Sequence, residues 1–338
     1  MKIELVTPDA KSAWDEFVIQ RPTTCYQRYD WLNVLADTYG CKPFHLGAWN
    51  DSTLVGTLPL FGVKKFGLGS YVSSMPGGVI ADDVSVAKAL VDEGIKLTQE
   101  RNASYFKLRD SQCQFKDDRL QNQIEHNFSV TLADSEDEMW KQIKKTCRRM
   151  VKKAQEHQLS MVSGQQHLKQ FYHIYALAMR RFGSPVPPLK FFESILKLFP
   201  EQTDILAVQR EERLIMAAIV FHHQDIIYDL YGASLHEERE CYPNDFYYWE
   251  LMRYGLRHNC TSLDFGRSLI DSGVAKFKQK WGAVTQPLHY QYALQNTSKL
   301  PDVRTDRRHQ WVMPIWKKLP LPIVNRLSAW VRAYMPFA

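Results

Sequence analysis

The sequence predicts a mixed α/β (α+β) fold built from two similar halves. Short apolar runs of strand type alternate with longer segments of helical spacing along the 338 residues. The segment 48–56 of the first half also parallels the segment 208–216 of the second. In each half a predicted helix then leads to a short strand, at 105–111 and at 262–268. We therefore expect a duplicated unit of meander strands flanked by helices.

Hydrophobic periodicity and turn residues place the individual elements. Apolar runs predict strands at 3–6, 44–49, 54–63, 71–74, 105–108, 205–208, 214–221, 226–231 and 263–265. Helical spacing predicts helices at 12–20, 30–39, 84–101, 135–154, 168–182, 189–199, 244–258 and 273–281. Four of these helices open with a residue whose side chain can accept hydrogen bonds from the first turn: Asp30, Ser135, Asn244 and Ser272.

Composition and missing motifs exclude several classes of protein. The net charge of +6 permits an anionic partner without requiring one. Six scattered cysteines suit reduced, mostly buried thiols rather than disulfides or a zinc site. No signal peptide or membrane span is visible, so we expect a cytoplasmic protein. The nucleophile-elbow, phosphate-loop, dinucleotide and His-Glu-x-x-His motifs are missing, and we expect no metal.

The most informative stretch runs from 263 to 281. A short strand delivers Asp264 and Arg267 to a turn, and a helix returns with Phe277 and Lys278. The guanidinium of Arg267 suits a carboxylate or phosphate, because its planar fork gives two parallel charge-assisted bonds. The alternative is an Asp264–Arg267 ion pair that only braces the turn. For the helix, the alternative is a core phenylalanine flanked by solvent-facing lysines.

A run of cations between 141 and 153 is the strongest electrostatic feature. It includes the substrate-binding candidates Arg148, Arg149, Lys152 and Lys153. Mutual repulsion of these charges favours an anionic partner, either a tRNA backbone, a lipid-linked diphosphate or anionic headgroups. The alternative is a solvated helix face.

Two further candidates stand beside aromatic residues. Arg180 follows three aromatic side chains on one helix, a composition that suits an anionic ligand with a ring, such as a nucleotide sugar. Tyr231 follows a strand and precedes Gly232, where it could protonate a leaving group. Each also has a structural interpretation, as an exposed arginine and a core tyrosine.

These motifs carry a resemblance to a known family. Asp264-Phe-Gly-Arg-Ser, followed by Phe277-Lys-x-x-Trp-Gly, resembles the FemAB-type proteins associated with PEP-CTERM and exopolysaccharide systems. That group is a branch of the Fem peptidyltransferase-like members of the GNAT (N-acyltransferase) superfamily. Further matching pieces lie at 58–60, 147–154, 183–185 and 243–244. The resemblance covers nearly the whole chain.

The resemblance implies tandem GNAT-like domains, each a mixed, mostly antiparallel sheet flanked by helices. The first would span 1–132, completed by about 298–338, and the second 133–297. It also implies that Phe277 and Lys278 lie at the acyl-transfer site, where Lys278 stabilises the carbonyl oxygen or a donor phosphate. Trp31 lies in a segment similar to the acceptor site of Fem proteins, with core packing as the alternative.

The function implied is transfer of an acyl or aminoacyl group to an amine of a cell-envelope, exopolysaccharide or peptidoglycan-type precursor. The donor would be acyl-CoA or aminoacyl-tRNA, but the usual acetyl-CoA loop is missing and no tRNA-binding arm is evident. Three alternatives stay open. They are a non-enzymatic membrane-peripheral module that binds an anionic glycolipid, an acyl-CoA-dependent N-acetyltransferase of a nucleotide sugar, and a nucleic-acid binder.

The last 25 residues are apolar and aromatic with interspersed cations. A helix there would carry Ile323, Leu327, Trp330 and Tyr334 on one side. It could lie on the inner face of the cytoplasmic membrane or dock on the first domain.

Overall fold

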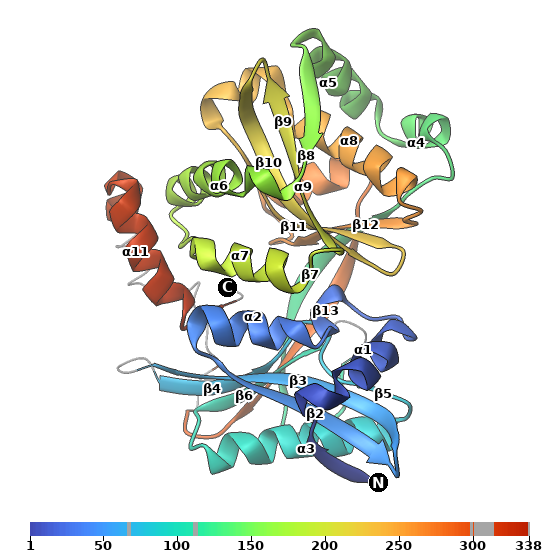
Figure 1. Cartoon of the computed structure of the whole chain (residues 1–338), viewed down its shortest axis with the longest axis vertical. Helices are drawn as coiled ribbons and strands as arrows, with labels where there is room; N and C mark the ends of the chain where they lie inside the picture. The colour runs from blue at the N-terminus through green and yellow to red at the C-terminus, as the bar shows by residue number, and fades with distance from the viewer. Residues whose placement is uncertain (66–68, 111–113, 298–299, 301–313, 337–338) are drawn as a thin grey trace. The chain divides into compact units, whose positions relative to one another are not determined.

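The computed structural model describes residues 1–65, 69–110, 114–297, 300 and 314–336 (Figure 1). Within them the chain divides into two compact units. Unit 1 comprises Met1–Glu125, Pro287–Gln310 and Ala329–Ala338, and unit 2 comprises His126–Gln286 and Trp311–Ser328, as far as these segments are described.

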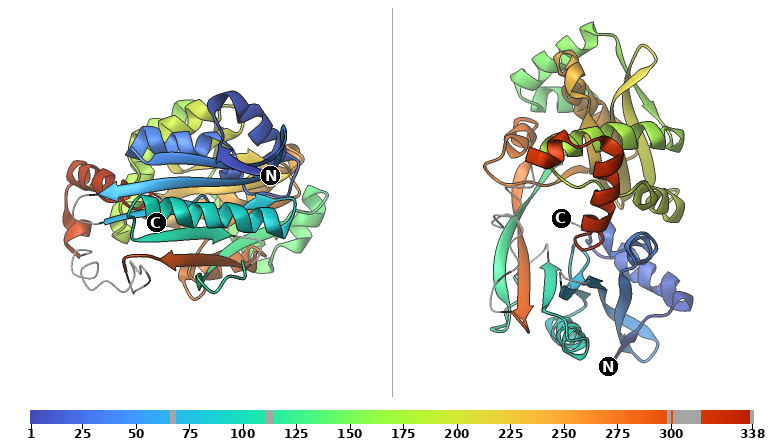
Figure 2. Two further views of the ribbon diagram at one scale, coloured as in Figure 1. Left: turned by 90° about the horizontal axis from the view of Figure 1, so that it is seen from below. Right: turned by 90° about the vertical axis from the view of Figure 1, so that its left-hand side faces the viewer.

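Unit 1 is a mixed sheet with helices on both faces. Its strand order is β1-β2-β3-β4-β6-β13, with β5 paired to β3. The strands are β1 (Lys2–Leu5), β2 (Lys42–Asn50), β3 (Thr53–Lys65), β4 (Gly69–Ser74), β5 (Ile80–Ala81), β6 (Tyr105–Asp110) and β13 (Val284–Leu294). The helices are α1 (Lys11–Ile19), α2 (Asp30–Tyr39) and α3 (Val84–Glu100). Helix α3 covers one face of the sheet, and α1 and α2 cover the other (Figures 1 and 2).

Unit 2 repeats this plan with the strand order β7-β12-β11-β10-β9-β8. The strands are β7 (Gln121–Thr131), β8 (Leu159–Ser163), β9 (Thr203–Arg210), β10 (Arg213–His223), β11 (Ile226–Ser234) and β12 (Ser262–Arg267). The helices are α4 (Glu136–Gln142), α5 (Lys145–Glu156), α6 (Leu168–Phe182), α7 (Leu189–Leu198), α8 (Pro243–Arg257) and α9 (Gly273–Lys280). A further helix, α11 (Leu321–Arg332), follows near the C-terminus.

The duplication predicted from the sequence is visible in the pairing of the strands. Each unit has an antiparallel meander, β2-β3-β4 or β9-β10-β11, followed by one long helix. The next strand then pairs in parallel with the last meander strand, β6 with β4 and β12 with β11. The predicted fold class, a mixed and mostly antiparallel sheet flanked by helices in each half, is confirmed.

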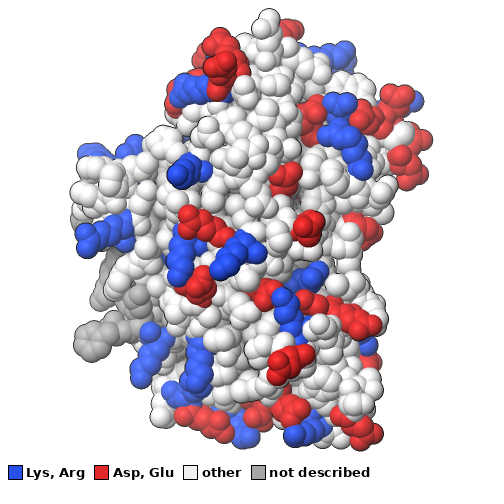
Figure 3. Space-filling view, viewed as in Figure 1, with Lys and Arg blue, Asp and Glu red and all other residues white. Residues whose placement is uncertain are grey.

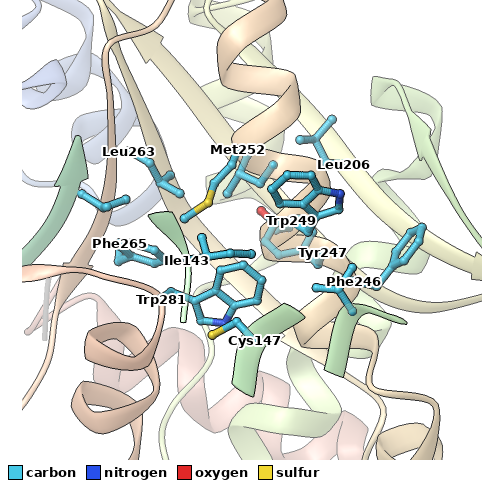
Figure 4. Packing of buried hydrophobic residues seen from close by; sticks show 14 of the residues in the cluster. Ile143, Cys147, Leu206, Phe246, Tyr247, Trp249, Met252, Leu263, Phe265 and Trp281 are labelled. Carbon is cyan, nitrogen blue, oxygen red and sulfur yellow. The ribbon is translucent and has the colours of Figure 1, made fainter. Parts of the chain in front are cut away.

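The core of unit 2 fixes the segment that carries the candidate site. Trp281, at the end of α9, is fully buried with Cys147 of α5 and Phe265 of β12 (Figure 4). The Cys147 Sγ also donates to the carbonyl of Lys280, at 3.3 Å. These contacts hold α9 against both α5 and β12, so the position of its side chains follows from packing rather than from helix propensity.

The predicted helix 135–154 is wrong in one respect, because it is two helices. Ile143 and Lys144 have extended backbones, with ψ of 145° and 146°, and separate α4 from α5. The Ile143 side chain is buried in the core, and Arg148 donates to the carbonyls of Trp140 and Lys141, each at 3.0 Å. These bonds satisfy carbonyl groups that the break leaves without helical partners.

Two of the four predicted caps are correct. Ser135 and Ser272 accept hydrogen bonds from the amides of Glu138 and Ala275. Asp30 is instead the first residue of α2, and its carboxylate pairs with Lys11 and Asn33. Asn244 is preceded in α8 by Pro243, whose fixed φ suits the first helical position.

Four remaining features concern the unpredicted strands, the cysteines, membrane-spanning helices and the surface charge. Strands β5, β7, β8 and β13 were not predicted; in β7 the first seven residues contain a single apolar side chain, that of Ile124. Five cysteines are free and buried, and Cys113 lies outside the described residues. No helix among the described residues is long and apolar enough to cross a membrane. On the face drawn in Figure 3, acidic and basic side chains are interspersed.

Candidate functional site

The candidate site of unit 2 lies where two parallel strands part. Strands β11 and β12 pair from Ile226 opposite Ser262 to Tyr228 opposite Asp264, and no further. Beyond that point β11 continues along β10, and its register shifts between Tyr231 and Asp229. Strand β12 continues along β7, with a second shift between Asp264 and Arg267. Bulges of this kind re-aim side chains and are frequent beside active sites.

Two acidic side chains lie at the split, one from each strand. The Asp229 carboxylate accepts hydrogen bonds from the hydroxyls of Tyr247, at 3.0 Å, and Tyr248, at 2.8 Å. The Asp264 carboxylate accepts from Nδ2 of Asn127, at 2.7 Å, and from the amide of Gly266, at 2.6 Å. Burial raises the pKa of both carboxyl groups, although these hydrogen bonds and the charge of Lys278 act in the opposite direction.

Lys278 of α9 completes the cluster. Its Nζ donates to the carbonyl oxygens of Gly266, at 3.0 Å, and Arg267, at 3.1 Å, and only 5% of the residue is exposed. Burial lowers the pKa of Lys278 to about 8, while the carboxylates of Asp229 and Asp264 oppose this effect. The described residues take two of the three hydrogens of the ammonium group, so one remains for a ligand.

Gly266 shapes the turn that supplies these carbonyl groups. Its φ is +70°, a conformation that strains residues with a Cβ atom. A Cβ atom here would meet no other atom within 4 Å, so the requirement for glycine comes from the backbone alone. The glycine therefore permits the bulge of β12 that directs the Gly266 and Arg267 carbonyls at Lys278.

The remaining predicted catalytic residues lie on two sides of this cluster. Phe277 is partly buried, and its ring centroid lies 5.5 Å from that of Tyr248. Tyr231 is partly exposed and packs edge-on against Phe192 of α7, with centroids 5.3 Å apart. Phe277 therefore contacts a tyrosine that binds Asp229, whereas Tyr231 belongs to an aromatic cluster with α6 and α7.

The predicted substrate-binding residues are divided between several places. Asp264 and Arg267 lie at the strand split, and the side chain of Arg267 is exposed. Arg180 of α6 donates to the carbonyl of Leu319, at 3.4 Å. Trp31 is fully buried in unit 1 beside Tyr26, the arrangement expected of a core residue.

The cations of α5 line a surface pocket of their own in unit 2. Its walls are Trp140, Lys145, Thr146, Arg148, Arg149, Lys152, Lys153 and Glu156. None of the ion pairs formed between described residues includes Arg148, Arg149, Lys152 or Lys153. The structure thus gathers all four predicted cations around one pocket, beside an indole ring.

Four residues of the cluster were not predicted from the sequence: Asp229, Asn127 and the two tyrosines of α8, Tyr247 and Tyr248. Asp229 lies in a strand that begins with the apolar residues Ile226 and Ile227. An acidic residue in such a strand indicates that its carboxylate has a buried partner. The tyrosines gave no such signal, because adjacent aromatic residues are also common in cores. Among the described residues, no group of three His, Cys, Asp or Glu side chains could hold a metal ion.

Comparisons with known proteins agree with this architecture. The model of an acetyltransferase (GNAT) domain matches residues 141–279, the part of unit 2 that contains α5, the strand split and Lys278. No curated protein matches the sequence.

Solved structures show the same fold over most of the chain. FemX matches with a TM-score of 0.71 and 16% identity, covering 88% of this chain and 98% of that one. L-PGS from Bacillus licheniformis has a TM-score of 0.56 and 11% identity, covering 94% and 99%. A tandem GNAT protein from the clavulanic acid biosynthesis pathway has a TM-score of 0.56 and 9% identity, covering 88% and 100%. The protein therefore has the tandem GNAT fold.

Proposed function

We propose that the protein is an N-acyltransferase that joins an acyl or aminoacyl group to an amine of a cell-envelope, exopolysaccharide or peptidoglycan-type precursor. The observation that supports this chemistry is the buried ammonium of Lys278, which is bound to the carbonyl oxygens of Gly266 and Arg267 at the split of β11 and β12. The charges of Asp229 and Asp264 act on this ammonium. The match to a GNAT domain over this region and the resemblance to FemAB-type proteins support the reaction class.

The reaction is direct attack of the acceptor amine on the activated ester or thioester of the donor. A C–N bond forms, a tetrahedral oxyanion develops, and the C–O or C–S bond to the donor then breaks. The amine loses one proton, and the departing alkoxide or thiolate gains one. The Lys278 ammonium stabilises the oxyanion through its third hydrogen, and its fixed position removes the need for solvent to reorganise.

The other site residues have supporting roles in this scheme. Asp229 and Asp264 keep Lys278 charged by opposing the effect of burial on its pKa. Phe277 positions Tyr248, which in turn binds Asp229. The exposed guanidinium of Arg267 binds a carboxylate or phosphate of a substrate, and Tyr231 remains the candidate for protonating the leaving group.

The basic pocket of α5 is the proposed site for the phosphates of the donor. Both expected donors, acyl-CoA and aminoacyl-tRNA, carry phosphate groups. Arg149 and Lys152 line the pocket without an acidic partner among the described residues, and Trp140 offers a ring for stacking. Arg148 has less freedom, because its Nη1 is bound to the carbonyls at the end of α4.

Product formation with Lys278→Met tests the proposal. The purified protein is incubated with acetyl-CoA, longer acyl-CoAs or aminoacyl-tRNA and with amino-sugar or peptide acceptors, and amide formation is measured by mass spectrometry. We expect the variant to lose about 100-fold to 1,000-fold in kcat, the usual effect of removing an oxyanion donor.

Lys276→Met is the matched control, since Lys276 is exposed on the same helix. It should keep the activity of the wild type. If the wild type forms no amide with any donor, the enzyme proposal is refuted. If Lys278→Met and Lys276→Met are equally active, the role of Lys278 is refuted while the reaction class survives.

A further inference from the structure

Helix α11 has one buried side and one exposed apolar side. Val324 and Ser328 are fully buried, and Arg332 is nearly so. Ile323 is 48% exposed, Leu327 44% and Trp330 53%, and their spacing of four and three residues places them in one stripe. We call these three residues the α11 stripe. In the right-hand view of Figure 2, no other helix or strand is drawn in front of α11.

The charges around the stripe have one sign. Residues 314–336 contain Lys317, Lys318, Arg326 and Arg332 and no acidic residue. The first three are exposed. In Figure 3 the left-hand edge of the molecule, where Figure 1 draws α11, carries basic and uncharged side chains. An apolar stripe bordered by cations is complementary to anionic headgroups above an acyl layer.

The same charges argue against a second copy of the chain as the occupant. A two-fold interface would place each stripe against itself and would bring the cations of the two copies together. In a bilayer with anionic lipid, the acyl chains can instead contact the apolar stripe, and the negatively charged headgroups can contact the cations beside it. Trp330, at one end of the stripe, has the amphipathic ring that prefers this interface.

Hydrogen bonds hold the segment at both of its ends. The carbonyl of Leu319, before α11, accepts from Arg180. The carbonyl of Tyr334, after α11, accepts from the hydroxyl of Tyr71 at 2.6 Å, and the two tyrosine rings lie edge to face. The stripe is therefore presented by an anchored helix rather than by a free tail.

We propose that α11 docks the protein on the surface of a bilayer that contains anionic phospholipid. Ile323, Leu327 and Trp330 enter the boundary between headgroups and acyl chains, and Lys317, Lys318 and Arg326 contact lipid phosphates. The proposal is independent of the acyl-transfer proposal, since it uses no residue of the strand split or of the α5 pocket.

Vesicle flotation of the full chain tests the docking. Vesicles of phosphatidylcholine alone are compared with vesicles that also contain phosphatidylglycerol. We expect the wild type to float with the anionic vesicles. The double variant Ile323→Asp/Leu327→Asp should bind them at least about tenfold more weakly, because the stripe no longer enters the acyl boundary. Replacing Lys317, Lys318 and Arg326 with glutamine should cost about fivefold per cation on anionic vesicles only.

Val84→Asp is the control, because Val84 is 79% exposed at the start of α3 in unit 1 and outside the stripe. It should float like the wild type. Thermal melting establishes that each variant folds, and Trp330→Ala replaces the double variant if that one does not. Docking is refuted if the wild type stays unbound, or if the stripe variants float unchanged. It is also refuted if light scattering shows a dimer that only the stripe variants dissociate.

Discussion

Burial of the Lys278 ammonium should make folding stability depend on pH. The pKa of Lys278 is about 8 in the folded chain against 10.5 for an ordinary lysine. Between these two values the unfolded chain binds the proton and the folded chain does not, so stability rises as pH rises. Below about pH 8 the full penalty is present. It amounts to on the order of 3 kcal/mol, at ~1.4 kcal/mol for each pH unit crossed.

Urea unfolding from pH 7 to 10.5, on the wild type and on Lys278→Met, measures this penalty. The methionine variant lacks the titrating group but keeps an unbranched chain of similar length. The difference in the free energy of unfolding, wild type minus variant, should therefore rise by about 3 kcal/mol across the window. The same difference for Lys276→Met should stay constant, because that exposed side chain keeps its water when the chain folds. A flat or falling curve for Lys278→Met would show that its charge carries no burial penalty.

Three other predictions concern the site. In Lys278→Arg the cation stays charged at high pH, whereas the charged fraction of Lys278 falls from about one half at pH 8 to about one hundredth at pH 10. The wild-type to variant ratio of kcat/KM should therefore fall about fiftyfold over this range, and a constant ratio would remove the ammonium from the mechanism. Gly266→Ala should lower the free energy of unfolding in urea by about 1–2 kcal/mol, because alanine is strained at a φ of +70°. Gly273 has no positive φ, so Gly273→Ala should not lower it. Equal effects of the two substitutions would contradict the backbone argument. The double variant Arg149→Gln/Lys152→Gln should raise the KM for a phosphate-bearing donor about fivefold and make this KM less dependent on salt, with kcat unchanged. Replacing the exposed Lys169 with glutamine should change neither the KM nor its salt dependence. An unaltered salt dependence in the double variant would exclude the α5 pocket as the donor site.

Residues of the candidate site that are close together in the sequence could be grouped before the structure was known. Asp264, Arg267, Phe277 and Lys278 lie within one strand, turn and helix, and the cap at Ser272 was predicted together with them. Hydrophobic periodicity was sufficient for most helices, since an apolar stripe must face a core. The split between β11 and β12 could not be predicted, because bulges depend on register between distant strands.

Partners brought in from far along the chain escaped prediction for the same reason. Asp229 binds Tyr248, which is 19 residues away, and Asp264 binds Asn127, which is 137 residues away. Only the parallel pairing of β11 with β12 brings the two acids to one point. The identity of the transferred group depends on the shape and chemistry of the binding site. Hydrophobic periodicity predicts secondary structure only, so the sequence does not identify this group.

The duplication also indicates why the candidate site belongs to unit 2. The pairing of Ser73 with Lys107 in unit 1 corresponds to that of Tyr228 with Asp264, so Ser74 stands where Asp229 stands. Ser74 is fully buried; its Oγ accepts from the amide of Arg109 at 2.8 Å and donates to a neighbouring carbonyl.

Lys107 takes the place of Asp264, and its ammonium lies over the rings of Tyr290 and Tyr292, 4.7 and 5.2 Å from their centroids. In unit 1 the strands are therefore joined by a side-chain bond at the position where they part in unit 2. The Ser74 hydroxyl of unit 1 has both a donor and an acceptor, whereas Lys278 of unit 2 keeps one hydrogen that no described residue accepts. We therefore expect substitutions at Ser74 and Lys107 to change stability alone, and those at Asp229 and Lys278 to change catalysis as well as stability.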